Sequence, residues 1–297
     1  MRLLGVPFAY ALLLLAVPLG AIALFSFWTQ DFMTVDTTFT LDNYREVRDS
    51  PIYGLLLRRS LMVSGLVTLV TVILAYPVAY FVSFHVAPSK KSLWLFLITI
   101  PFWTSYLIRV FLWKVILGYN GVINTTILQA SNLFQRIYDK TGLEFFLWAS
   151  SKTDEPLTFI LYNVNAVIIT LAHAFAPFAI LPIFVVLEKI DRSLLEASRD
   201  LGETKLTTFF RVTLPLSMSG VVGATLIVFI PTIGDYVTPE LMGGAGGKLI
   251  ANMIQTQFLQ LNNAPLGAAL AVVAMVCVAG ISLAFVFLNR RYLRSRT

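Results

Sequence analysis

The sequence predicts an all-α membrane protein with six transmembrane helices. The 297 residues are 57% hydrophobic and only 13% charged, whereas a soluble domain carries about 25% charged residues. The apolar residues also form long runs without the alternation of barrel strands, so helices are the expected form in a bilayer. We therefore expect a single transmembrane domain over residues 1–297.

Six apolar runs reach the length of about 20 residues that a helix needs to cross the hydrocarbon core. They comprise residues 6–27, 61–84, 93–117, 159–187, 217–237 and 266–288. The first run continues past Ala21-Ile22-Ala23, a sequence that resembles a signal-peptidase site. Because the apolar region of a signal peptide has only about 7–15 residues, we interpret this run as a retained membrane anchor.

Basic residues predict that both termini are cytoplasmic. Lys90 and Lys91 lie in the short VAPSKKS turn between the second and third runs, and four arginines lie in the C-terminal RRYLRSRT tail. Short cytoplasmic segments are enriched in Lys and Arg. The net charge of +6 thus reflects topology, because the basic residues form no single stripe. We expect membrane lipid, and not nucleic acid, around this chain.

Two long segments, 28–60 and 118–158, then lie on the outer side. The first contains TLDNYREV, which predicts a surface helix with Asp42 as its N-cap. The second is rich in aromatic residues, which typically anchor a loop at the membrane interface. A docking surface for an external protein is the alternative for that segment.

The longest segment on the predicted cytoplasmic side, 188–216, contains LLEASRDLGETKLTTFFRVTLP. Ser193 and Glu196 have the spacing of a capping box, which predicts a helix start. Gly202 predicts its end, because glycine adopts left-handed dihedrals cheaply. Between them, one helical face carries Leu194, Ala197, Ser198 and Leu201.

A second short helix is expected after Gly202, with Leu206, Phe209 and Phe210 on one face. Leu214-Pro215 is expected to limit it, since proline has no N–H to donate and restricts its predecessor. Pattern alone leaves two interpretations open. The pair lies on the lipid surface, or it inserts into a groove of a partner protein.

The same stretch resembles the EAA signature of ABC importer permeases, the membrane subunits of binding-protein-dependent uptake systems. That signature reads Glu-Ala-Ala, three residues, Gly, nine residues, Ile, one residue, Leu-Pro. Glu196-Ala197-Ser198, Gly202, Val212 and Leu214-Pro215 keep this spacing. Ser198 replaces the second alanine, and Val212 replaces isoleucine.

The resemblance implies a type I importer permease with the MetI-like fold in the bacterial inner membrane. It implies that residues 188–216 form a coupling segment seated in a cleft of a cytoplasmic ATPase. The residues implied in this contact are Glu196, Ala197, Ser198, Arg199, Asp200, Gly202, Leu214 and Pro215. Further implied partners are a second homologous permease, a second ATPase subunit and a periplasmic or extracellular substrate-binding protein. ATP and Mg²⁺ are expected on the ATPase subunits, with no cofactor on this chain.

Three further stretches are similar to spermidine/putrescine permeases. They are FTLDNY at 39–44, IPFWTSYLIRVFLWK at 100–114 and GDYVTPELMGG at 234–244. These phrases are more specific than the EAA signature, which many importers share. They imply the first of the two permease subunits of a polyamine-type system. An importer for another small organic solute remains the alternative.

Two charged residues within the apolar runs are candidates for function, because an intramembrane charge is expensive. Arg109 follows Leu93 by 16 residues and Asp235 follows Ser217 by 18. At ~1.5 Å per helical residue, both lie about 24–27 Å from the start of their runs. We expect either an Arg109–Asp235 ion pair or a contact between Asp235 and a substrate ammonium, and the two can alternate.

Aromatic residues near these charges suit a polyammonium substrate through cation–π attraction. Trp103, Tyr106 and Tyr236, with Asp235, are the substrate-pathway candidates, and helix packing is the alternative role for the aromatics. Pro231 is expected to kink the fifth run, with Gly234 as a hinge.

Other functional classes lack their motifs. No GxxxxGK[ST], HExxH or GxSxG sequence is present, so we expect a transport subunit and no enzyme. One cysteine and two separated histidines predict no metal site. An ATP-independent channel or secondary transporter is the remaining rival, but it would not need an ATPase-docking segment.

Overall fold

The computed structural model describes residues 2–32, 34–153, 160 and 162–294. These residues are mostly helical, with one two-stranded antiparallel hairpin. The chain forms two compact units. Unit 1 comprises Met1–Ser64, Ile230–Tyr236 and Leu249–Thr297, and unit 2 comprises Gly65–Phe229 and Val237–Lys248.

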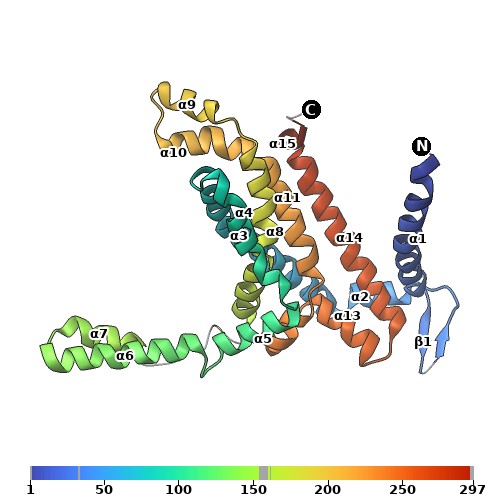
Figure 1. The fold of residues 1–297 in the computed structure, drawn as a ribbon. Helices are drawn as coiled ribbons and strands as arrows, with labels where there is room; N and C mark the ends of the chain where they lie inside the picture. Colours follow the sequence, from blue (N-terminus) through green and yellow to red (C-terminus); the bar gives the residue numbers. More distant parts are fainter. Residues whose placement is uncertain (1, 33, 154–159, 161, 295–297) are drawn as a thin grey trace. The chain divides into compact units, whose positions relative to one another are not determined.

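Unit 1 contains the first and last elements of the chain (Figure 1). Its elements are α1 (Arg2–Phe25), β1 (Thr29–Asp31), β2 (Thr34–Asp36), α2 (Asp42–Asp49), the start of α3 (Pro51–Phe84), α13 (Ile250–Leu259), α14 (Ala264–Leu288) and α15 (Arg290–Arg294). The long helix α14 packs against α1, α2 and α13. In the hairpin, Thr29 lies opposite Asp36.

The predicted surface helix in TLDNYREV is confirmed as α2, but its N-cap is Leu41 and not Asp42. Asp42 is the first residue of the helix, and its backbone N–H donates to Thr40 Oγ1 at 3.2 Å. The buried Asn43 amide donates to the carbonyl oxygens of Ser26 at 3.0 Å and Trp28 at 2.7 Å. This side chain ties α2 to the turn that follows α1.

Unit 2 contains the middle of the chain (Figure 1). Its elements after α3 are α4 (Pro88–Thr99), the 3-10 turn η1 (Ile100–Trp103), α5 (Tyr106–Leu117), α6 (Val122–Thr141), α7 (Glu144–Thr153), α8 (Val164–Glu188), α9 (Arg192–Asp200), α10 (Lys205–Thr208), the π-helical turn η3 (Phe209–Thr213), α11 (Leu214–Ile233), α12 (Val237–Met242) and the 3-10 turn η4 (Ala245–Gly247). The boundaries between the units fall within α3, within the last turn of α11, before α12 and before Leu249.

The core of unit 2 is built around α8, where Leu171, Ile183 and Leu187 are fully buried. Helix α11 approaches α8 closely at Gly220, where a Cβ atom would lie 2.8 Å from the Pro182 carbonyl oxygen. A second cluster joins α5 and α12 through Val110 and Met242. At the first of these contacts, the small residue Gly220 lets the two membrane helices approach closely.

Five stretches of the described residues are long and apolar enough to cross a membrane. They are Pro51–Phe84, Tyr106–Thr141, Val164–Glu188, Lys205–Ile233 and Ala264–Leu288, and a shorter apolar stretch covers Tyr10–Phe25. The predicted runs overlap these stretches, although the first part of the run 93–117 lies on α4 and η1, before the stretch Tyr106–Thr141. Residues 159 and 161 of the fourth run lie outside the described residues. The all-α membrane fold is therefore confirmed.

Two of the six predicted runs contain breaks that hydropathy does not reveal. The run 93–117 is divided into α4, η1 and α5, with extended backbone at Thr104 and Ser105. The run 217–237 loses its helix at Ile233 and resumes in α12 at Val237. The straight-helix depth estimate for Arg109 and Asp235 therefore does not hold, because each follows an interruption or lies within one.

Candidate functional site

The coupling segment contains two short helices, but the predicted capping box at its start is wrong. Asp191, and not Ser193, is the N-cap of α9, and its carboxylate accepts the Ser193 backbone N–H at 3.0 Å. Ile190, which directly precedes this cap, is buried. Hydrogen bonding to the backbone N–H of Ser193 lowers the pKa of the Asp191 carboxyl.

The predicted helix end at Gly202 is confirmed. Gly202 has φ of +88°, its N–H donates to Arg199 O at 2.8 Å, and Glu203 N–H donates to Ser198 O at 3.2 Å. These two bonds form a Schellman motif, which satisfies the last carbonyls of a helix. The turn places α10 next to α9, and a contact between the hydroxyl groups of Ser198 and Thr208 at 3.0 Å joins them.

The expected faces of α9 are partly corrected. Ser198 points inward with Leu195, and both are buried, whereas Leu194 and Ala197 are exposed. Glu196, Arg199 and Asp200 are also exposed, and their contact with an ATPase stays a prediction. Ser198 therefore stabilises the pair of helices from within and does not lie on its outer surface.

Large apolar side chains are exposed on the outer surface of the pair. Leu201 is 86% exposed, Leu206 69% and Phe210 57%. An ion pair between Arg211 Nη1 and Glu203 Oε1, 2.6 Å long, lies on the same two-helix unit. The surface thus combines apolar and charged groups, as expected of a protein-docking surface with a polar rim.

The expectation that Leu214-Pro215 limits the second helix is wrong. Leu214 N–H donates to Phe209 O, five residues back, and the helix continues through Pro215 into α11. A π-turn accommodates the proline, because it shifts the hydrogen-bond register just before the residue that has no N–H. The coupling segment is therefore joined to α11 without a break, with Leu214 half-buried and Pro215 exposed.

The first group of pathway candidates lies where the run 93–117 is broken. Trp103 is 74% exposed and packs edge-on to Phe96 at 5.4 Å between ring centroids. Tyr106 begins α5, and its hydroxyl lies 2.7 Å from that of Thr238 on α12. The helices that follow the two interruptions are thereby joined inside unit 2.

Arg109 lies one turn into α5, and its guanidinium faces aromatic rings. Its Cζ lies 5.2 Å from the Phe102 ring centroid and 5.8 Å from that of Tyr106. One Nη donates to Ala174 O at 3.4 Å, and the buried Nε has no hydrogen-bond partner among the described residues. Arg109 is therefore a cation with unused donor capacity beside the break.

The second group of pathway candidates lies in unit 1. Asp235 is 9% exposed and Tyr236 43% exposed, and both belong to the non-helical stretch after α11. The buried Asn252 donates to Tyr236 O at 2.9 Å and accepts the Leu249 N–H at 3.1 Å. Asn252 thus holds this stretch in place, and the sequence carried no signal for that role.

Beside this stretch, unit 1 contains a cavity of about 690 Å³ with mostly apolar walls. Tyr236, Gln255, Phe258 and Ser282 contribute its aromatic and polar edges. Asp235 belongs to unit 1 and Arg109 to unit 2, so the predicted ion pair between them stays a prediction. Within the described part of the chain, no group of three or more His, Cys, Asp or Glu side chains has metal-site geometry.

Broken membrane helices, with an exposed two-helix segment that runs directly into one of them, are typical of membrane transport proteins. The family model described as "Binding-protein-dependent transport system inner membrane component" matches residues 5–294, and the chain belongs to this family. It is a multi-pass protein of the bacterial inner membrane and the permease component of an ABC importer. The chain is a transport component and not an enzyme.

Its relatives include spermidine/putrescine transport system permease proteins named PotB. The PotB of Escherichia coli strain K12 is 38% identical over 259 residues, 87% of this chain and 86% of that protein. The PotB of Haemophilus influenzae is 33% identical over 97% of this chain and 93% of its own length. The inner membrane ABC transporter permease protein YdcU of Escherichia coli is 30% identical, over 88% of this chain and 80% of its own length.

A solved structure shows the same fold. It is the crystal structure of a bacterial alginate ABC transporter in complex with an alginate pentasaccharide-bound periplasmic protein. The TM-score is 0.69 at 17% identity, over 99% of this chain and 94% of that one. As a member of a binding-protein-dependent system, the chain works with a substrate-binding protein and an ATPase.

Proposed function

We propose that this permease imports polyamines such as spermidine and putrescine. The observation that carries the assignment is its 38% identity, over 87% of the chain, to a permease named for these solutes. It forms half of a translocation pathway and pairs with a second homologous permease. Two ATPase subunits, which bind ATP and Mg²⁺, dock on the cytoplasmic side, and an external binding protein delivers the solute.

In this proposal the coupling segment, residues 188–216, is the docking surface for one ATPase. The exposed side chains Leu201, Leu206 and Phe210 supply the apolar contact. Glu196, Arg199 and Asp200 supply its charged contacts. Gly202 sets the angle between α9 and α10 through its left-handed backbone. When the two ATPases close on ATP, the segment moves with them, and α11 follows because no break separates it from η3.

The pathway is proposed to run along the two interruptions. At membrane depth, non-helical backbone is tolerated only where it is buried in protein or lines a water-filled cavity. Trp103 ends the 3-10 turn η1, and Thr104 and Ser105 are non-helical. All three residues are exposed on this chain. Such a stretch is unsuited to lipid, so it faces the second permease or the aqueous pathway.

Asp235 and the aromatic residues give this pathway its preference for cations. A carboxylate with aromatic faces attracts ammonium groups through charge and cation–π interactions. Trp103, Tyr106 and Tyr236 supply the aromatic faces. Arg109 either pairs with Asp235 while no substrate is bound, or leaves the Asp235 carboxylate available to bind the solute.

The test is uptake and co-purification with the Asp235→Asn variant, beside wild type. Wild type is expected to co-purify with an ATPase and a second permease, and to import radiolabelled spermidine. Intact variant complexes with a selective loss of spermidine uptake would support the pathway role. Loss of assembly would support the ion pair with Arg109, and normal uptake would refute both. A wild-type homo-oligomer without ATPase would refute the docking proposal.

A different small organic solute is the second candidate, because the relative YdcU carries a name that specifies no solute. The associated binding protein separates the two. It is expected to bind spermidine or putrescine in a thermal-shift titration. A binding protein that ignores both polyamines would redirect the assignment to another solute, while leaving the transport class unchanged.

A further inference from the structure

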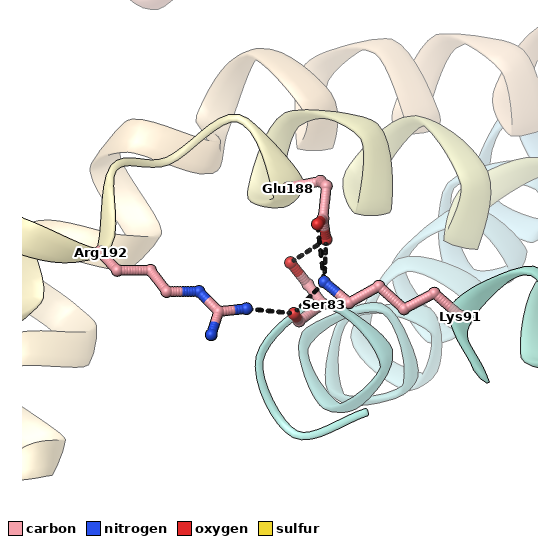
Figure 2. A network of polar contacts seen from close by, with 4 residues as sticks. All are labelled: Ser83, Lys91, Glu188 and Arg192. Carbon is pink, nitrogen blue, oxygen red and sulfur yellow. Dashed lines mark hydrogen bonds and ion pairs between the residues drawn. The ribbon is translucent and has the colours of Figure 1, made fainter. Parts of the chain in front are cut away.

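A lysine at the end of the helix bundle makes polar contacts that the proposed function does not use (Figure 2). Lys91, the fourth residue of α4, is 8% exposed. Its Nζ donates to Ser83 O at 2.8 Å and to the two carboxylate oxygens of Glu188 at 2.6 and 2.7 Å. All three donors of the ammonium group therefore have acceptors. The contacts join the end of α3, the start of α4 and the end of α8.

Both charges lie at the helix ends that disfavour them. Lys91 is in the first turn of α4, where the helix dipole favours anions, and Glu188 is the last residue of α8, where it favours cations. Ser83 Oγ gives Glu188 a further hydrogen bond at 3.2 Å. The positions of the two charges are therefore explained by the ion pair between them, since the dipole of each helix disfavours the charge that it carries.

The same network reaches the coupling segment. Arg192, the first residue of α9, donates from Nη2 to the Ser83 carbonyl oxygen at 3.4 Å. Ser83 O thus accepts from both Lys91 and Arg192, as Figure 2 shows. Three residues separate Glu188 from Arg192, and the middle one, Ile190, is buried. The start of α9 therefore contacts α3 through Ser83 O, which is the same oxygen that Lys91 of α4 holds beside Glu188 of α8.

We propose that Lys91 and Glu188 are positioning residues for energy coupling. Their ion pair clamps the coupling segment to α3, α4 and α8, so that these helices move with α9 as one body. This inference rests on the proposed docking of the segment on an ATPase. Without the clamp, α9 follows the ATPase while α4 stays behind, and ATP binding no longer drives the pathway open.

The experiment uses the full transporter with its ATPase, and measures the distance between spin labels on α4 and α9. Labels are placed by Ser89→Cys and Ser193→Cys, both exposed, in a Cys277→Ser background. Distances are recorded without nucleotide and with ATP under non-hydrolysing conditions. The clamp is removed by Lys91→Met. Lys90→Met is the matched control, because Lys90 is the exposed neighbour and loses the same charge.

With the clamp intact, the distance between the labels is expected to stay the same when ATP binds. In Lys91→Met it is expected to shift or broaden with ATP, and Lys90→Met is expected to behave as wild type. The doubly reversed variant Lys91→Glu/Glu188→Lys is expected to restore the wild-type result in part. Both helix dipoles favour the reversed charges, but a carboxylate at position 91 cannot donate to Ser83 O as Lys91 does. Spermidine uptake per assembled Lys91→Met complex should fall about tenfold, within the range typical of coupling between two sites.

An ATP-dependent distance in wild type would overturn the proposal, as would an unchanged distance in Lys91→Met. A Lys91→Met chain that fails to assemble is replaced by Lys91→Arg with Glu188→Gln, which preserves volume and weakens the pair. A distance between the labels that stays unchanged with ATP in this double variant would also overturn the proposal. Failure of the docking proposal is distinct, because the ATPase would then be absent from the purified wild-type complex.

Discussion

The hydroxyl groups of Tyr106 and Thr238 lie 2.7 Å apart and join the first turns of α5 and α12. Each of these helices follows an interruption of a predicted membrane run. Thr238 is fully buried, and the two residues are separated by 132 positions in the sequence. The bond therefore fixes the relative positions of two helix starts that local structure does not control.

Removing this bond should destabilise the permease without unfolding it. Tyr106→Phe and Thr238→Val each delete one partner, and each should lower the free energy of unfolding by about 1 kcal/mol. The double variant should cost less than the sum, because both changes remove the same bond. Unfolding in mixed micelles by SDS titration measures this coupling. Tyr119→Phe, at an exposed tyrosine, is the control, and strictly additive losses would contradict the expectation.

Gly220 is expected to tolerate no larger side chain. A Cβ atom there would lie 2.8 Å from Pro182 O and 3.0 Å from Val186 Cγ2, so Gly220→Ala forces α11 away from α8. Overpacking of this kind costs about 1–3 kcal/mol. We expect a lower melting temperature in detergent and less assembled complex. Gly223→Ala, on the same helix with open space around its Cβ, should be neutral, and equal losses at both positions would refute the steric explanation.

The apolar runs predicted the membrane helices because transfer into lipid depends on composition, which the sequence states directly. Helices such as α8 and α14 therefore lie where the runs 159–187 and 266–288 predicted them, within the described residues. The breaks could not be predicted in the same way. The run 93–117 is mostly apolar on both sides of the break, and hydropathy does not report whether the backbone remains helical at Thr104 and Ser105.

Within the coupling segment, the sequence predicted a helix end correctly where one residue type determines the backbone conformation. Gly202 ends α9 because few other residues accept its dihedral angles. The start of α9 was less predictable, since Asp191 and Ser193 are both good caps, and burial of Ile190 accompanies the use of Asp191. The contact between Lys91 and Glu188 spans 97 residues, so no local pattern indicates it.

Gly202→Ala should impair coupling through the backbone alone. No atom lies within 4 Å of the position of the added Cβ, so the cost comes from the φ of +88° and not from a clash. A non-glycine residue in this conformation costs about 1–2 kcal/mol. We expect weaker co-purification of the ATPase and reduced uptake. Gly202→Asn should be milder, because asparagine tolerates left-handed backbone. An alanine variant with full ATPase binding and uptake would contradict the proposed role of the turn.

The cap of α9 should make the start of the coupling segment sensitive to acid. Hydrogen bonding to the Ser193 backbone N–H lowers the pKa of Asp191 below its ordinary, unfolded value of about 3.9. Its stabilisation is therefore present at pH above that unfolded value, and is lost as the pH falls through the lowered folded pKa. Hydrogen exchange of the α9 amides, corrected for intrinsic rates, should show protection that declines only in this acidic window. Asp191→Asn should keep protection without that decline, because it retains an acceptor that does not titrate, whereas Asp191→Ala should lose protection at every pH. A decline of the same size in Asp191→Asn would assign the acid sensitivity to another group.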